Sequence, residues 1–248
     1  MLRSDAPRAR ALAVLASAAV LAGCATTGPA SPNDPYEGFN RGVFEFNDAL
    51  DRYALKPLAR GYQAVVPETV RFIVGNMFAN LGDVYTALNQ LLQGKPVLAL
   101  SDLTRFVVNS TWGFAGAADV ASAIGLARHD EDFGQTLGRW GVPSGPYLVL
   151  PFFGPSTFRD APARYVDSYG NPVGYIPDIP ARNSAYGLSV VDTRAGLLRS
   201  ERLLDGAALD KYSLIRDGWL QRRRNAVHDG DPPDELPNYE EDEEPKSK

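Results

Sequence analysis

The segment PETVRFIVGNMFANLGDVYTALNQLLQGKP, residues 67–96, has the spacing of one long amphipathic helix. Pro67 suits a first helical turn, and Gly94 with Pro96 suits a helix end. Between them, apolar side chains recur at every third or fourth position and would lie on one stripe. They are Val70, Ile73, Met77, Leu81, Val84, Leu88 and Leu91. The segment therefore predicts a helix.

Helical spacing continues on both sides of this segment. Upstream, Asp34-Pro35-Tyr36-Glu37 predicts a helix start with Asp34 as the N-cap. Its apolar stripe would be Phe39, Val43, Phe46, Leu50 and Tyr53. Downstream, we expect helices at about 97–112, 188–204 and 207–224, the last with Leu209, Tyr212, Ile215 and Trp219 on one face. Strand-like alternation is nearly absent, so the sequence predicts an all-α fold.

The apolar stripes have two interpretations. An apolar helix face usually packs into the core of its own protein. It can instead touch lipid when the chain is held at a membrane. No segment after residue 24 has 18 uninterrupted apolar residues, so none is expected to span a bilayer alone.

The N-terminus predicts export. Arg3, Arg8 and Arg10 precede an apolar run at 11–22 that is too short to span a membrane, a pattern typical of a signal peptide over residues 1–23. The following chain is predicted to be a tether at 24–33, a helical domain at 34–228 and a disordered acidic tail at 229–248.

A lipid anchor is predicted at the end of the signal peptide. Leu21-Ala22-Gly23-Cys24 resembles the bacterial lipobox, in which the cysteine is acylated and becomes the mature N-terminus. The alternative is an ordinary secretory signal with a chance cysteine. Ala25 favours the outer membrane, with the protein on its periplasmic side.

Composition excludes several kinds of site. Cys24 is the only cysteine, so the folded body can hold no disulfide and no thiolate metal site. The segment 24–228 has no net charge, which gives no support for nucleic-acid binding. We find no serine-elbow, nucleotide-binding or zinc-protease motif, and predict neither catalytic residues nor a cofactor. His129, among acidic residues, could hold a metal, but we interpret it as part of a solvated loop and predict no metal site.

The segment 138–158 is unusual because it is rich in glycine and proline yet also apolar and aromatic. Ordinary surface loops are polar. It is therefore either an irregular loop packed beneath helices or a segment at a membrane interface, where aromatic residues are favoured. The interface residues would be Trp140, Tyr147, Phe152 and Phe153.

The segment 105–119 also mixes polar and apolar residues. Asn109, Ser110, Thr111 and Asp119 lie among aromatic and aliphatic side chains. Polar groups in such surroundings need partners or water. They could line a wet passage or cap helices, and the residue physics alone favours capping.

Several motifs in order resemble the MlaA (VacJ) lipoprotein family. The opening motif runs from Asp34 and Pro35 through Phe39, Asn40 and Arg41 to Asn47. Residues 104–110, Gly113 and 119–121 also match, as do 132–141, 145–147, 150–155, Arg159-Asp160, Thr193-Arg194-Ala195 and the helix at 210–223. The resemblance covers roughly residues 34–225, nearly the whole body.

The resemblance implies a ring of amphipathic helices in the inner leaflet of the outer membrane, with an amphipathic central passage. Such proteins take misplaced phospholipid from the outer leaflet and pass it to a soluble periplasmic carrier. They associate with trimeric porins and are not enzymes. On this basis Asn109, Gly113, Gly116 and Asp119 are expected near the passage, and the first helix is expected to set the resting state of the ring.

Two other functions remain open. A structural lipoprotein could scaffold a porin without moving lipid. A periplasmic lipid hydrolase would need a reactive serine or a metal, and the missing motifs count against it.

Overall fold

The computed structural model describes residues 34–204 and 210–233. The predicted signal peptide, Cys24, the predicted tether, Leu209 and residues 234–248 lie outside the described residues.

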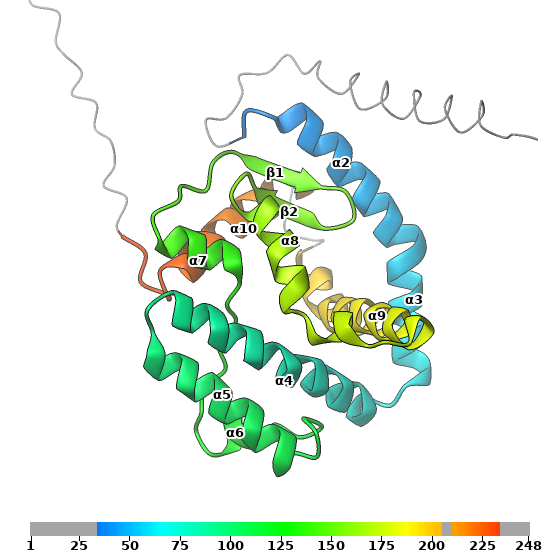
Figure 1. Ribbon diagram of the computed structural model, residues 1–248. Helices are drawn as coiled ribbons and strands as arrows, with labels where there is room; N and C mark the ends of the chain where they lie inside the picture. Colours follow the sequence, from blue (N-terminus) through cyan, green and yellow to red (C-terminus); the bar gives the residue numbers. More distant parts are fainter. Residues whose placement is uncertain (1–33, 205–209, 234–248) are drawn as a thin grey trace, which may run out of the picture.

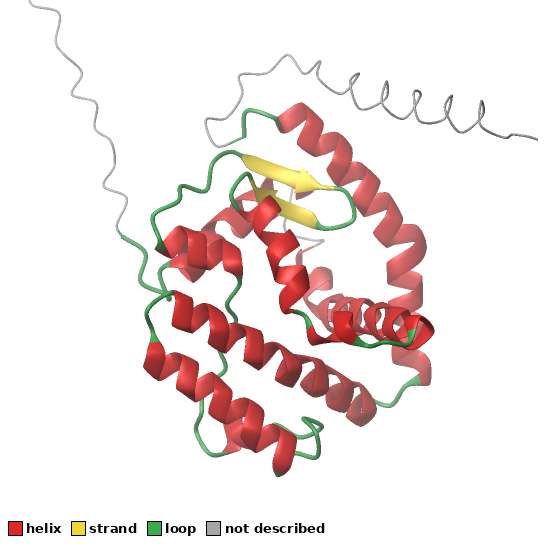
Figure 2. Ribbon diagram, in the orientation of Figure 1, coloured by secondary structure: helices red, strands yellow, loops and turns green. Residues whose placement is uncertain are grey.

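The regular secondary structure of the described residues is helical apart from one small hairpin (Figures 1 and 2). Its first half contains α2 (Glu37–Leu50), the π-helical turn η1 (Asp51–Leu55), α3 (Lys56–Val65), α4 (Glu68–Leu92), α5 (Pro96–Thr111) and α6 (Val120–Ala123). Its second half contains α7 (Phe133–Arg139), β1 (Tyr147–Leu150), β2 (Gly154–Thr157), α8 (Asp160–Gly170), the 3-10 turn η2 (Pro172–Tyr175), α9 (Ile179–Leu204) and α10 (Lys211–Val227). The prediction of an all-α fold is confirmed.

The expected helices at 67–96 and 97–112 correspond closely to α4 and α5. Two other boundaries were wrong. Helix α9 begins at Ile179 rather than near 188, because Asp178 accepts a hydrogen bond from the Ala181 N–H at 2.8 Å and Pro180 suits a first turn. Helix α10 begins at Lys211 rather than 207, with Asp210 as the N-cap.

The predicted N-cap role of Asp34 was also wrong. Helix α2 begins at Glu37, its N-cap position is Tyr36, and no side chain caps it. The Asp34 carboxylate is fully buried and instead accepts hydrogen bonds from the side chains of Asn40 and Tyr212.

The segment 138–158, expected to be irregular, contains an antiparallel hairpin. Tyr147 pairs with Thr157, and Leu150 pairs with Gly154. Side chains alternate along β1, so Tyr147 and Val149 point into the protein, where they pack with Tyr212 of α10. Phe44 of α2 and Trp219 of α10 lie against the same cluster.

Helices α4 and α5 pack against each other with their polar faces inward. In α4 the buried side chains include Asn76, Asn80, Asp83 and Gln90. The apolar stripe is exposed instead: Val70, Met77, Val84, Leu88 and Leu91 are each at least 38% accessible. For these residues the usual interpretation of the stripe as protein core is wrong.

In Figure 1 the elements run around a central region instead of stacking as a parallel bundle. Helices α2 and α3 form one curved side, and α4 with α5 form another. Helix α3 also packs on α9 through the buried residues Ala59, Ala195 and Leu198. The arrangement places α7, α8 and α10 around a shared interior space.

Candidate functional site

A cavity of about 770 Å³ lies between α7, α8 and α10. Its lining is strongly charged, and Phe153 and Trp219 give it an aromatic portion. The charged residues are Asp130, Asp132, Asp160, Arg164, Asp167, Arg222 and Arg223. A second cavity of about 290 Å³ shares Asp130, Asp132, Asp167, Asn171 and Tyr186 with it, so the two spaces adjoin.

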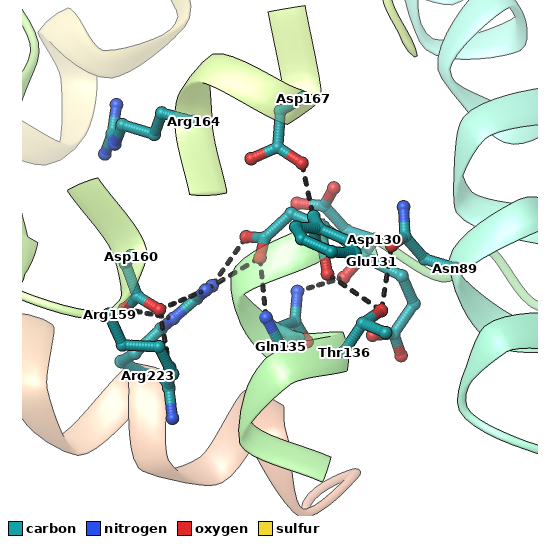
Figure 3. A network of polar contacts seen from close by, with 12 residues as sticks. Asn89, Asp130, Glu131, Gln135, Thr136, Arg159, Asp160, Arg164, Asp167 and Arg223 are labelled. Carbon is teal, nitrogen blue, oxygen red and sulfur yellow. Dashed lines mark hydrogen bonds and ion pairs between the residues drawn. The ribbon is translucent and has the colours of Figure 1, made fainter. Parts of the chain in front are cut away.

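Arg223 of α10 is the centre of the ionic network in this cavity (Figure 3). Its Nη1 and Nη2 atoms lie 2.6 and 2.7 Å from the two oxygens of Asp132. Its Nε and Nη2 atoms lie 2.8 and 3.0 Å from the oxygens of Asp160, which also binds Arg159 at 2.8 Å. This network joins α7, α8 and α10 with two positive and two negative charges.

The network stabilises its own charges. Burial alone would lower the pKa of Arg223, but hydrogen bonds and the charges of Asp132 and Asp160 raise it above its ordinary value. Gly134 allows the close approach, because a Cβ atom there would lie 2.3 Å from the Nη2 atom of Arg223. A larger residue at position 134 would therefore displace the arginine.

Side-chain hydrogen bonds join α4 to α7 and to the loop before α7, beside the cavity. Thr136 donates to the Oδ1 atom of Asn89 at 2.8 Å, and Gln93 donates to Glu131 at 2.8 Å. Burial raises the pKa of Glu131, although Gln93 and Lys95 act to lower it. The interior next to the cavity is thus held by hydrogen bonds rather than by apolar packing.

Asn109 and Asp119, which were expected at the passage, bind each other. The Asn109 amide donates to the Oδ1 atom of Asp119 at 3.0 Å and accepts from the Ala121 N–H at 2.9 Å. Asp119 is the N-cap of α6 and binds Arg105 at 3.0 Å. Capping therefore accounts for Asp119, while a place at the lipid passage stays a prediction.

The two glycines of the predicted passage lie in the same tight turn. A Cβ atom on Gly113 would lie 2.2 Å from the Ala118 carbonyl oxygen. Gly116 has a φ of +87°, and a Cβ atom there would lie 2.8 Å from the Asn80 side chain. Both positions need glycine for close packing.

The opening motif attaches α2 to the hairpin. The Asn40 side chain donates to the Tyr147 carbonyl at 3.1 Å and accepts from the Val149 N–H at 2.8 Å. Asn47 donates to the Leu150 carbonyl at 2.9 Å and accepts from the Phe152 N–H at 2.8 Å. Each amide thus occupies the place of a peptide unit of a neighbouring strand.

The other motif residues have different surroundings. Arg41 forms an ion pair of 2.6 Å with Asp210 and lies 4.4 Å from the centre of the Tyr212 ring. Phe39 is half-buried and Pro35 is exposed. Arg41 therefore joins the start of α2 to the start of α10.

Three of the four expected interface aromatics are exposed. Trp140, Phe152 and Phe153 are 55 to 70% accessible. The prediction was wrong for Tyr147, which is 1% accessible because strand alternation turns it inward.

The charged residues of the cavity were missed as site residues. Asp132 and Asp160, together with Arg159 beside the cavity, lie in stretches that match the family, so a signal for them existed. Arg223 lies in the matching stretch 210–223, whereas Arg164 and Asp167 of α8 lie in no matching stretch, and only the tertiary fold brings them to the cavity.

Within residues 34–204 and 210–233, no helix is long and apolar enough to cross a membrane. In the same part of the chain, no group of three or more histidine, cysteine or acidic side chains is arranged to hold a metal ion.

These residues define an α-helical protein that exposes apolar helix faces and contains an open, charged cavity. A family model described as MlaA lipoprotein matches residues 32–226. The chain belongs to the MlaA lipoprotein family.

Individual relatives agree with this assignment. The chain is 35% identical over 226 residues to the intermembrane phospholipid transport system lipoprotein MlaA of Escherichia coli (strain K12), covering 88% of this chain and 89% of that protein. It is 35% identical over 227 residues to the protein of the same name from Haemophilus influenzae, and the match covers 88% of this chain and 90% of that protein. A solved structure, described as the structural basis for maintenance of bacterial outer membrane lipid asymmetry, matches with a TM-score of 0.68 and 34% identity, covering 78% of this chain and 98% of that chain.

Proposed function

We propose that this lipoprotein removes mislocalised phospholipid from the outer leaflet of the outer membrane and passes it to a soluble periplasmic carrier. The observation that carries the proposal is the inverted distribution of polarity: apolar residues of α4 and α5 face outward, whereas polar residues face the interior and the cavity. This distribution suits a protein in contact with hydrocarbon that offers a polar path to a headgroup, because unpaired polar groups are costly in lipid.

The exposed apolar surface supports a position in a membrane leaflet. On α5 and the turn after it, Leu100, Val107, Trp112 and Phe114 are more than half accessible. Groups of exposed apolar side chains mark surfaces that bind membrane or another protein. We propose that this face lies among acyl chains of the inner leaflet and that Cys24 carries the lipid anchor on the periplasmic side.

The transport role also implies two protein partners. We propose a trimeric porin at the apolar face and a periplasmic lipid carrier, and that no catalysis is involved. The attachment of α2 to the hairpin through Asn40 and Asn47 supports a role for the first helix in the resting state of the ring.

Deletion of the gene tests the proposal. Phospholipid in the outer leaflet is measured with a membrane-impermeant amine label, and porin trimers are quantified in the same cells. We expect exposed phospholipid to rise on deletion, to return with the wild-type chain, and to remain high with Cys24→Ser. Unchanged exposed phospholipid with fewer porin trimers would instead establish the scaffold function.

A further inference from the structure

The charged cavity contains opposite charges that the fold leaves without ionic partners. Asp132, Asp160 and Arg223 are joined in the network that includes Arg159. Arg164 and Asp167, both on α8, line the same cavity but lie outside that network.

Arg164 is a partly buried cation without a carboxylate partner. Its Nη2 atom donates to the Pro155 carbonyl at 3.1 Å, and no carboxylate oxygen of the described residues lies within 4.0 Å of it. Figure 3 draws its guanidinium pointing away from the network, with no dashed line to another residue. Burial lowers the pKa of Arg164 because the more distant carboxylates do not compensate for lost hydration.

Asp167 is the complementary case, a carboxylate that only neutral groups contact. Its Oδ1 atom accepts from the Phe133 N–H and from the Tyr85 hydroxyl, both at 2.8 Å. Among the residues that the structure describes, nothing donates a hydrogen bond to its Oδ2 atom and no cation lies within 4.0 Å. Burial raises the pKa of Asp167, as expected for a carboxylate without a counter-charge.

The two side chains could have neutralised each other, since they stand three residues apart on one helix. Instead, Pro155 holds one and Phe133 with Tyr85 holds the other, so the cavity presents a separated positive and negative charge. Its size of about 770 Å³ is within the range of small-molecule sites.

We propose that this pair recognises a zwitterionic phosphoethanolamine headgroup, with Arg164 binding the phosphate and Asp167 binding the ammonium. The proposal rests on the proposed phospholipid transport and adds the class of headgroup. A phosphoglycerol headgroup would satisfy Arg164 but leave the Asp167 carboxylate without a cation. The wild-type protein should therefore prefer the zwitterionic lipid.

Binding of two lipids to the purified, lipidated full chain tests the proposal. Acyl-labelled fluorescent phosphatidylethanolamine and phosphatidylglycerol are titrated in micelles of an uncharged detergent. The variants are Arg164→Gln and Asp167→Asn, and Arg60→Gln on α3 is the control because Arg60 is exposed and does not line this cavity. Asparagine keeps the oxygen that accepts from Phe133 and Tyr85, so Asp167→Asn removes the charge with little change of shape.

We expect the wild type and Arg60→Gln to bind phosphatidylethanolamine about tenfold more tightly than phosphatidylglycerol, since one charged hydrogen bond has roughly this effect. Asp167→Asn should abolish the preference for phosphatidylethanolamine. Arg164→Gln should lower the affinity for both lipids by about tenfold. If Arg164→Gln does not fold, as judged by circular dichroism, the test rests on Asp167→Asn. Loss of the preference for phosphatidylethanolamine in that variant supports the headgroup site, and an unchanged preference contradicts it.

Three outcomes would overturn the proposal, each in a different way. If both variants bind both lipids like the wild type, the headgroup site is wrong while transport stands. If millimolar inorganic phosphate displaces the lipid from the wild type, the site is a general anion site. If the wild type binds neither lipid, the proposed function itself fails.

Discussion

Two regions of this protein bury opposite kinds of side chain. Between α4 and α5 the interior contains amides and charges, including Asn80, Asp83 and Arg105, and apolar residues face outward. Between the hairpin, α2 and α10 the interior contains Tyr147, Val149 and Tyr212. The second region buries apolar and aromatic side chains, as proteins in water usually do. The first is suited to an apolar surrounding, where polar groups must find their partners inside.

The polar interior should be the more sensitive region. Arg105 is fully buried and binds Asp119, Ser122 and the Leu126 carbonyl. Arg105→Ala would leave Asp83 and Asp119 with only the partly exposed Arg128 as a cation, at 3.9 and 3.5 Å, and we expect the free energy of unfolding to fall by about 3–5 kcal/mol. Thermal unfolding in detergent measures this, with Arg60→Ala as an exposed control. Equal stability of the two variants would contradict the structural role of the network.

Asp83 gives the same region a pH dependence. Burial raises the pKa of Asp83 from 3.8 to about 6, although Arg128 and Arg105 act to lower it. Since the folded state binds the proton more tightly than the unfolded chain, the stability contributed by Asp83 falls as pH rises from about 4 to about 6.

Asp83→Asn should remove this loss. Between pH 4 and pH 7, we expect the free energy of unfolding of the variant to rise by on the order of 2 kcal/mol relative to that of the wild type. Unfolding temperatures of both proteins across this range provide the measurement. A difference that stays constant with pH would show that Asp83 does not titrate there.

Two tyrosines between the hairpin, α2 and α10 allow a comparison with smaller expected changes in stability. The Tyr212 hydroxyl donates to Asp34, whereas the buried Tyr147 hydroxyl has no hydrogen-bond partner among the described residues. We expect Tyr212→Phe to lower the free energy of unfolding by about 1–3 kcal/mol and Tyr147→Phe to leave it unchanged or raise it. Chemical denaturation of both variants distinguishes the two, and equal losses would show that Tyr147 has a partner.

The exposed apolar face should respond least in stability. Leu100→Ser removes an apolar side chain that is 66% accessible, so the free energy of unfolding in detergent should change by less than about 0.5 kcal/mol. Its effect should appear as weaker flotation with phospholipid vesicles. A large loss of stability with unchanged flotation would mean that Leu100 packs within the protein.

Periodicity predicted the helices better than their orientation. In α4 the buried residues Asn76, Asn80, Asp83, Ala87 and Gln90 also recur at steps of four and three. The helix therefore has two regular faces, and spacing alone does not say which one is inside. Which face is buried depends on whether water or hydrocarbon surrounds the helix, and the spacing of the residues carries no information about that.

The site was less predictable than the fold. The sequence motifs pointed to Asn40, whose contacts with β1 explain why an amide stands there. Nothing local distinguishes Arg164 or Asp167 from exposed charges on any helix. Their charges are kept apart by hydrogen bonds to Pro155, Phe133 and Tyr85, which only the tertiary fold brings to α8.

The attachment of Asn40 and Asn47 to β1 also bears on association with other chains. A two-stranded hairpin has open edges, and an open edge is a template for strand addition by another chain. The two amides occupy hydrogen-bonding groups of Tyr147, Val149, Leu150 and Phe152 along that edge. Helix α2 thus leaves fewer free hydrogen-bonding groups on that edge for a strand of another chain.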